Sequence, residues 1–127
     1  DLKRVINYVY KLLTSKGVFF GMLDNSETQL PSDPRYGVVI NLEENNKKIE
    51  DNSLRRISLY QHGAEVLHFH NFAWQTKTIK EILEKSGFSQ IAFKEATVSP
   101  DGIKKYGEEF WKEYKEHPDQ VVFSATK

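Results

Sequence analysis

The stretch Lys11-Leu-Leu-Thr-Ser-Lys-Gly-Val-Phe-Phe-Gly-Met-Leu-Asp-Asn25 decides how the rest of this chain is interpreted. It starts as the end of a helix, stops at Gly17, and continues as an apolar strand from Val18 to Leu23. An apolar run without alternation is typical of a strand buried on both faces, as in the parallel sheets of α/β proteins. In open α/β sheets, ligands bind just beyond the carboxyl ends of the strands. The sequence therefore predicts a central strand, with Asp24 and Asn25 at the rim of a binding crevice.

The composition indicates one folded domain without a strong preference for charged partners. The 127 residues are 39% hydrophobic, and 18 basic residues balance 18 acidic ones. A balanced charge does not favour nucleic acid or an anionic membrane, so we expect neither as a partner. No apolar stretch approaches the roughly 18 residues that a transmembrane helix needs. The absence of cysteine excludes disulfides and thiolate metal sites, and it favours a cytoplasmic location.

Helix and strand signals alternate along the chain. Apolar residues at helical spacing predict a helix at the N-terminus, and short runs bounded by turn residues predict strands. Two strands joined at His62-Gly63 should pair antiparallel, whereas the charged stretch Glu43 to Ser53 should be an exposed, mobile loop. Ser99-Pro-Asp-Gly102 is expected to be a turn. In chain order the expected elements are a helix (2–14), four strands (18–23, 38–42, 55–61 and 65–72), a helix (76–86), a strand (91–98), a helical segment (103–116) and a final strand (121–125).

Several short motifs occur along the chain in this order. They are Leu12-Leu13-Thr-Ser-Lys-Gly17-Val-Phe, Tyr36-Gly37, Phe69-His70-Asn71-Phe72, Leu83-Glu-Lys-Ser-Gly87-Phe88, Val98-Ser-Pro-Asp-Gly102, Tyr106-Gly107-x-x-Phe110-Trp111, His117-Pro118 and Phe123-Ser-Ala125-Thr-Lys127. Together they resemble the C-terminal half of class I S-adenosylmethionine-dependent methyltransferases. More narrowly, they resemble small-molecule methyltransferases of the toxoflavin-biosynthesis type. The run from Ser99 to Lys127 is the specific part of this resemblance, whereas the first and fourth motifs are generic.

The resemblance implies a fold, a cofactor and an activity. The implied fold is α/β: the C-terminal half of a Rossmann-like methyltransferase with a mixed sheet, forming one partial domain over residues 1–127. Residues 36–72 would be an antiparallel insert on the substrate side. The implied cofactor is S-adenosylmethionine and the implied substrate is a small molecule. However, the family binds its cofactor mostly through a Gly-rich turn in the N-terminal half, and this chain has no G-x-G-x-x-G. We therefore expect it to be a portion of the enzyme that is inactive and binds no cofactor alone.

Two histidines are candidates for catalysis. His68 and His70 should share one face of their strand, because side chains alternate along a strand. A neutral imidazole can accept a proton from a substrate near neutral pH, so either residue could be an accessory general base. Paired imidazoles can also bind a metal, but no carboxylate at a fixed offset supports this, and we assign no metal site. The alternative is that both are ordinary half-exposed residues of an antiparallel sheet.

One polar and five aromatic residues are candidates for substrate binding. Aromatic side chains often line pockets for planar ligands, although the same residues also build cores and interfaces. An Asn in a turn can likewise cap backbone groups rather than bind a ligand. The candidates are Asn25, Tyr36, Phe72, Trp74, Tyr106 and Trp111.

Two further hypotheses concern architecture and assembly. The chain could instead be a non-enzymatic α+β module for ligand binding or dimerisation, in which the strands form one continuous antiparallel sheet. If the chain is half of a methyltransferase domain, the flank of Val18 to Leu23 should lack its neighbouring strand. An apolar edge of this kind recruits other strands, so we expect the chain to associate with itself.

Overall fold

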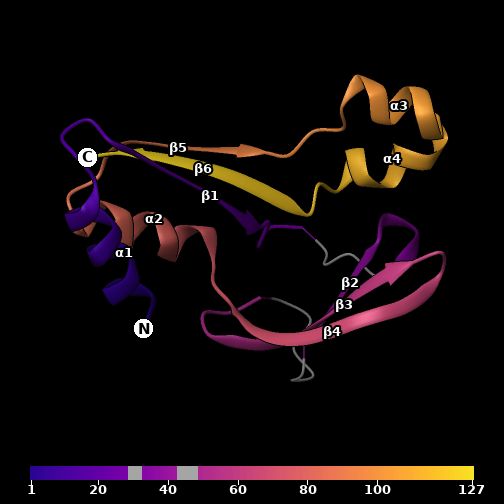
Figure 1. Cartoon of the computed structure of the whole chain (residues 1–127), viewed down its shortest axis with the longest axis horizontal. Coiled ribbons are helices and arrows are strands. Elements are labelled where there is room, and N and C mark those ends of the chain that lie inside the picture. The colour runs from indigo at the N-terminus through magenta and orange to yellow at the C-terminus, as the bar shows by residue number, and fades with distance from the viewer. Residues whose placement is uncertain (29–32, 43–48) are drawn as a thin grey trace.

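The structure of the chain, a computed structural model, describes residues 1–28, 33–42 and 49–127 and contains two separate three-stranded sheets (Figure 1). The helices are α1 (Leu2–Leu12), α2 (Thr76–Lys85), α3 (Pro100–Tyr106) and α4 (Glu108–Glu116), with a short 3-10 helix η1 (Pro34–Tyr36). The strands are β1 (Val18–Asp24), β2 (Val38–Leu42), β3 (Ser53–Gln61), β4 (Ala64–Ala73), β5 (Ser89–Glu95) and β6 (Gln120–Thr126). No helix among these described residues is long and apolar enough to cross a membrane.

The first sheet has the order β1-β6-β5, and β6 runs antiparallel to both of its neighbours. β1 and β5 therefore run in the same direction with β6 between them. Gly21 pairs with Phe123, and Ala92 pairs with Ser124. Among the described residues β1 is an edge strand rather than a central one, because β6 pairs with one edge and no described strand pairs with the other. A free edge on β1 is what the half-domain hypothesis expects.

The main core lies between one face of this sheet and the helices α1 and α2. Figure 1 shows both helices on the same side of the sheet. Ile6 of α1 and Leu83 of α2 are buried there against Phe123 and Ala125 of β6. Phe88 follows the end of α2, and its ring makes edge contact with Tyr10 at 5.0 Å between centroids. The apolar stripe of each helix therefore finds its partner on this face, as an amphipathic helix requires.

The opposite face of β1 is uncovered. Val18, Phe20 and Met22 are 58%, 67% and 61% exposed, whereas Phe19 and Leu23, on the other face of the strand, pack on the core. The apolar run suggested a strand buried on both faces, and this expectation is wrong. The reason is that no described helix packs on the side of β1 opposite α1 and α2.

The second sheet, β2-β3-β4, is antiparallel throughout and confirms the predicted pairing of these segments. His62 and Gly63 join β3 to β4 with positive φ values of 53° and 80°, the backbone that a tight hairpin turn needs. The described strands thus form two sheets rather than the single continuous sheet that the non-enzymatic hypothesis requires. Residues 43–48 of the loop expected to be mobile lie outside the described residues, and Ile49 near its end is buried.

The segment after β5 corrects another expectation. Ser99 does not sit in a turn: its side chain caps α3 by accepting a hydrogen bond from the Gly102 amide at 3.1 Å, and Pro100 is the first helical residue. A serine cap followed by proline is a helix start, and the sequence analysis overlooked it. Gly107, with φ of 86°, then separates α3 from α4. The Trp111 indole donates to the Gly102 carbonyl at 3.0 Å and holds the two helices together.

Candidate functional site

A crevice of about 130 Å³ lies at the carboxyl end of β1, between the two sheets. This is the place where the sequence predicts a binding rim, and where open α/β sheets bind ligands. Residues from β1, β3, β4 and β6, together with the residue after β4, line it. They are Met22, Leu23, Asp24, Arg55, Phe72, Ala73, Trp74 and Gln120.

A buried ion pair forms the polar wall of the crevice. The guanidinium of Arg55 contacts the carboxylate of Asp24, and the two side chains are 9% and 18% exposed. Arg55 Nε also donates to Asn71 Oδ1 at 2.5 Å. Burial lowers the pKa of Arg55 below its ordinary value, so the nearby carboxylate is needed to compensate the cation. The pair presents a polar wall with no net charge.

Arg55 was not identified from the sequence, although a signal for it exists. Side chains alternate along β3, so Arg55 shares one face with Ile57. Ile57 pairs with Ile40 on β2, and both are buried. An arginine in line with buried isoleucines needs a buried anion, which Asp24 provides.

The aromatic wall of the crevice consists of Phe72 and Trp74, two of the predicted substrate-binding residues. Phe72 lies near the end of β4 and is 54% exposed. Trp74 follows β4 directly and packs partly on the main core. The structure brings these two residues together with Asp24, so the crevice combines aromatic surface with hydrogen-bonding groups. Small-molecule sites have this character.

Asn25 is beside the crevice but does not line it. It is 4% exposed, and its amide nitrogen donates to Glu95 Oε1 at 3.1 Å and to the Pro118 carbonyl at 3.0 Å. Its side-chain oxygen accepts from the Glu27 amide at 3.1 Å. Its side chain thus ties the end of β1 to the end of β5 and to the loop before β6. These hydrogen bonds already occupy its side-chain amide. Its predicted contact with substrate stays a prediction.

A second buried acid, Asp119, lies just before β6 and also escaped sequence reasoning. It is 8% exposed, and burial raises its pKa, opposed by a hydrogen bond from Tyr114. Burial, followed by the charge of Asp119, raises the pKa of Tyr114 to about 12. The backbone carbonyl of Asp119 accepts a hydrogen bond from the backbone N–H of Asn25 at 2.7 Å. This acid therefore belongs to the polar network that supports the crevice.

The other three predicted substrate residues form a separate aromatic cluster. The ring of Tyr36 stacks on Trp111 at 5.7 Å, and its hydroxyl donates to the Phe110 carbonyl at 3.0 Å. Tyr106 stacks on Phe110 at 5.0 Å. The cluster joins η1 to α3 and α4, so these rings pack mainly on one another. None of the three lines the crevice.

His68 and His70 share one face of β4, as predicted, with perpendicular rings 6.4 Å apart. His68 Nδ1 lies 2.9 Å from Glu65 Oε1, and Arg56 donates to the same oxygen at 2.8 Å. The neighbouring Ser58 hydroxyl, followed by His68, lowers the pKa of Glu65. Neither histidine lines the crevice, but Phe72 follows His70 by two residues and so lies on the same face of the strand. The catalytic role of these histidines stays a prediction.

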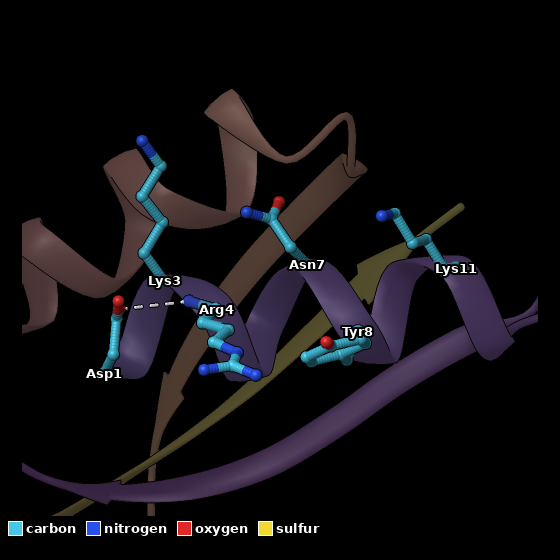
Figure 2. Close-up of a pocket in the computed structure, with 6 residues that line it drawn as sticks. All are labelled: Asp1, Lys3, Arg4, Asn7, Tyr8 and Lys11. Carbon is cyan, nitrogen blue, oxygen red and sulfur yellow. Dashed lines mark hydrogen bonds between the residues drawn. The ribbon is translucent and has the colours of Figure 1, made fainter.

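Two other hollows are weaker candidates. One, of about 240 Å³, lies between the residues after β5 and the end of α4, and includes Tyr114 and Pro118. The other, of about 340 Å³, is open and is lined only by Asp1, Lys3, Arg4, Asn7, Tyr8 and Lys11. Figure 2 shows that all of these side chains leave α1 and the residue that caps it, so this hollow is the outer surface of one helix.

The comparisons with known proteins concern the fold alone. No protein-family model matches the chain, and no curated protein matches its sequence. Two similar structures are described as S-adenosylmethionine-dependent methyltransferases. The one from Listeria monocytogenes has a TM-score of 0.61 at 20% identity, and the one from Mesorhizobium loti has 0.59 at 15%. Both matches cover the whole of this chain but only 55% and 56% of the matched chain. By fold, the chain is therefore similar to a little over half of an S-adenosylmethionine-dependent methyltransferase.

Proposed function

We propose that this chain is the C-terminal portion of an S-adenosylmethionine-dependent methyltransferase, and that the crevice at the end of β1 receives a small-molecule methyl acceptor. The likeness of the fold to two such enzymes supports the reaction class. The single observation that supports the site is that the crevice joins aromatic and polar side chains at the strand end where the fold binds ligands. The toxoflavin-type subgroup is part of the proposal and rests on the motifs from Ser99 to Lys127.

The residues of this chain do not fit the cofactor. Its glycines form no turn of the G-x-G-x-x-G kind, and Gly21 of β1 is covered by the ring of Phe123 rather than open to a ligand. The acidic side chain in the crevice, Asp24, is already paired with Arg55. A sulfonium cofactor with ribose hydroxyls needs a close backbone approach and an unpaired carboxylate. We therefore propose that residues outside this chain bind the cofactor, and we derive no step through it.

What this chain contributes is the positioning of the acceptor. Methyl transfer is an in-line displacement, in which orientation and exclusion of water provide much of the acceleration. Phe72 and Trp74 offer aromatic surface to a planar acceptor, and Asp24 and Gln120 offer hydrogen-bonding groups at its edge. Because Arg55 compensates the charge of Asp24, the crevice favours an uncharged molecule.

A proton leaves the acceptor when an oxygen or nitrogen is methylated, and we propose His70 as the nearer of two possible proton acceptors. It lies two residues from Phe72 on the same face of β4, about 7 Å along the strand. His68 is twice as far from Phe72 along the strand. The role is accessory, since positioning is the main contribution.

The test is acceptor binding by the isolated chain. We would titrate a panel of uncharged planar phenols and heteroaromatics and follow the two indole N–H signals by NMR. We expect ligands that shift the Trp74 signal, and we expect Phe72→Ala to remove that shift. Tyr106→Ala is the matched control, because Tyr106 is 50% exposed but belongs to the other aromatic cluster. Binding that survives Phe72→Ala and fails in Tyr106→Ala would move the acceptor site to that cluster.

A further inference from the structure

The side chain of Asn25 makes hydrogen bonds on two sides of the segment that follows β1. Its amide nitrogen donates to Glu95 at the end of β5 and to the Pro118 carbonyl before β6. Its amide oxygen accepts from the Glu27 backbone N–H, which closes a turn around Ser26. All of these partners belong to the described residues, and Asn25 is 4% exposed. The contacts are therefore already enclosed by this chain.

The turn that Asn25 closes holds Ser26 against the start of α2. The residue that precedes this helix, Gln75, makes no side-chain hydrogen bond that would cap it. The Thr76 backbone N–H donates to the Ser26 hydroxyl oxygen at 3.2 Å. This N–H is one of the four that a helix leaves without a partner in its first turn. A serine from another segment thus does what the local cap residue does in most helices.

These two sets of contacts act on different walls of the crevice. Asp24, in the polar wall, directly precedes Asn25. Trp74, in the aromatic wall, lies two residues before Thr76. The segment from Asn25 to Ser26 therefore connects the strand end that carries Asp24 with the helix start that follows Trp74.

We propose that Asn25 is a positioning residue that sets the distance between the two walls of the crevice. It acts through Asp24 on one side, and through Ser26 and the start of α2 on the other. The inference rests on the proposed function only for the nature of the ligand, since any ligand of the crevice would meet the same walls. An asparagine suits this position because its amide offers two N–H donors and one acceptor oxygen. Here the nitrogen has two acceptors and the oxygen has a donor.

The substitution Asn25→Asp keeps the shape of the side chain and removes only its donors. The new carboxylate oxygen would lie beside the Glu95 carboxylate and the Pro118 carbonyl, where the amide nitrogen donates in the natural chain. Three acceptors would then meet without a hydrogen, so at neutral pH the segment should move away from Glu95. Two carboxylates in contact favour binding of one proton between them. Acidification should therefore restore a hydrogen bond and return the segment to its place.

The first experiment follows the two indole N–H signals by NMR without ligand, at about pH 7.5 and at about pH 5. We expect Asn25→Asp to shift the Trp74 signal at the higher pH and to return it to the wild-type position at the lower pH. The Trp111 signal is the internal control, because its indole donates to the Gly102 carbonyl in the other aromatic cluster. Asn7→Asp, on the outer surface of α1 (Figure 2), is the matched control and should leave both signals in place.

A folded Asn25→Asp chain whose Trp74 signal matches the wild type at both pH values overturns the proposal. A Trp74 shift that persists at the lower pH contradicts the role of the amide donors, and a joint shift of Trp74 and Trp111 shows a general loss of structure instead. If Asn25→Asp does not fold, Ser26→Ala decides, because it removes only the acceptor of the Thr76 N–H. It should shift the Trp74 signal equally at both pH values, and an unshifted signal contradicts the coupling of the two walls.

The second experiment separates this inference from the proposed function. Phenol, an uncharged planar probe, is titrated into the wild type and Asn25→Asp at the same two pH values. At the higher pH we expect the variant to bind about five- to tenfold more weakly, through loss of roughly one hydrogen bond to a displaced Asp24. At the lower pH the two should bind equally. Unchanged binding by the variant contradicts the positioning role and leaves the proposed function intact. A wild type that does not bind phenol counts against the proposed function, and the signals recorded without ligand then decide the positioning role.

Discussion

Asp24 at the end of β1 and Arg55 within β3 form an ion pair that connects the two sheets. No described strand of one sheet hydrogen-bonds to a strand of the other, so side-chain contacts such as this one hold the sheets in position. Nearby, the Ser26 hydroxyl accepts from the Thr76 backbone amide at 3.2 Å and joins the segment after β1 to the start of α2. The crevice owes its shape to these few contacts.

Replacing Arg55 should destabilise the protein much more than replacing its neighbour. Arg55→Met leaves Asp24 without a partner, and we expect a loss of about 2–4 kcal/mol in the free energy of unfolding. Arg56→Met removes an ion pair with Glu65 that is partly open to solvent, and should cost less than about 1 kcal/mol. Urea unfolding followed by circular dichroism measures both. Equal losses would show that the Asp24–Arg55 pair contributes no more than a surface pair.

Tyr114 should keep its proton well above the ordinary pKa of a tyrosine. Burial, assisted by the charge of Asp119, raises its pKa to about 12. The folded state therefore keeps the proton that the unfolded state releases near pH 10, and this contribution to stability is lost as the pH rises from 10 to 12. Ultraviolet titration of the wild type and of Tyr114→Phe should differ by one group ionising near pH 12. A difference centred near pH 10 would contradict the structure.

The chain alone should not bind S-adenosylmethionine tightly. It has no Gly-rich turn, and its crevice carboxylate, Asp24, is paired with Arg55. Titration calorimetry with the folded chain should give no saturable heat at micromolar concentrations of cofactor. A micromolar dissociation constant would show that residues within these 127 form a cofactor site.

Gly21 should be needed for packing rather than for backbone freedom. A Cβ at this position would overlap the ring of Phe123, its partner on β6. Phe123 is buried and has Phe19 and Phe93 as aromatic neighbours, so its ring cannot move without disturbing the core. We expect Gly21→Ala to cost about 1–3 kcal/mol in unfolding free energy.

The double variant Gly21→Ala, Phe123→Leu is the control for that prediction, because the smaller side chain makes room for the new methyl group. It should lose less stability than the sum of the two single variants. Strict additivity would mean that Gly21 and Phe123 do not interact as the structure indicates.

Local patterns predicted most elements of this fold. The spacing of Ile6 and Val9 indicated α1, and the pair His62-Gly63 indicated the hairpin of the second sheet. They did not reveal that β6 lies between β1 and β5, because strand order depends on contacts between segments a hundred residues apart. The same apolar run that identified β1 also suggested burial on both faces. That inference failed because hydrophobicity shows what a residue prefers and not what is available to cover it.

The candidate site was likewise predicted only in part. Its place at the end of β1 and its two rings, Phe72 and Trp74, followed from chain order and residue type. Arg55 was missed because its role depends on Asp24, thirty-one positions earlier in the chain and on another sheet. The separation of Tyr36 and Trp111 from the crevice also depends on tertiary packing, which composition does not encode.

The position of β6 also determines when the first sheet can form during synthesis. β6 is the middle strand of that sheet, yet it is the last of the described elements to be made. A ribosome adds about 5–20 residues per second, so β1 waits for several seconds before the strand that pairs with it exists. Through this interval β1 has no partner among the described strands, whereas β3 and β4 can pair as soon as their short turn is made. The nascent chain is therefore most vulnerable to aggregation through β1, and a chaperone that recognises short apolar strands should bind at Val18 to Leu23 before synthesis ends.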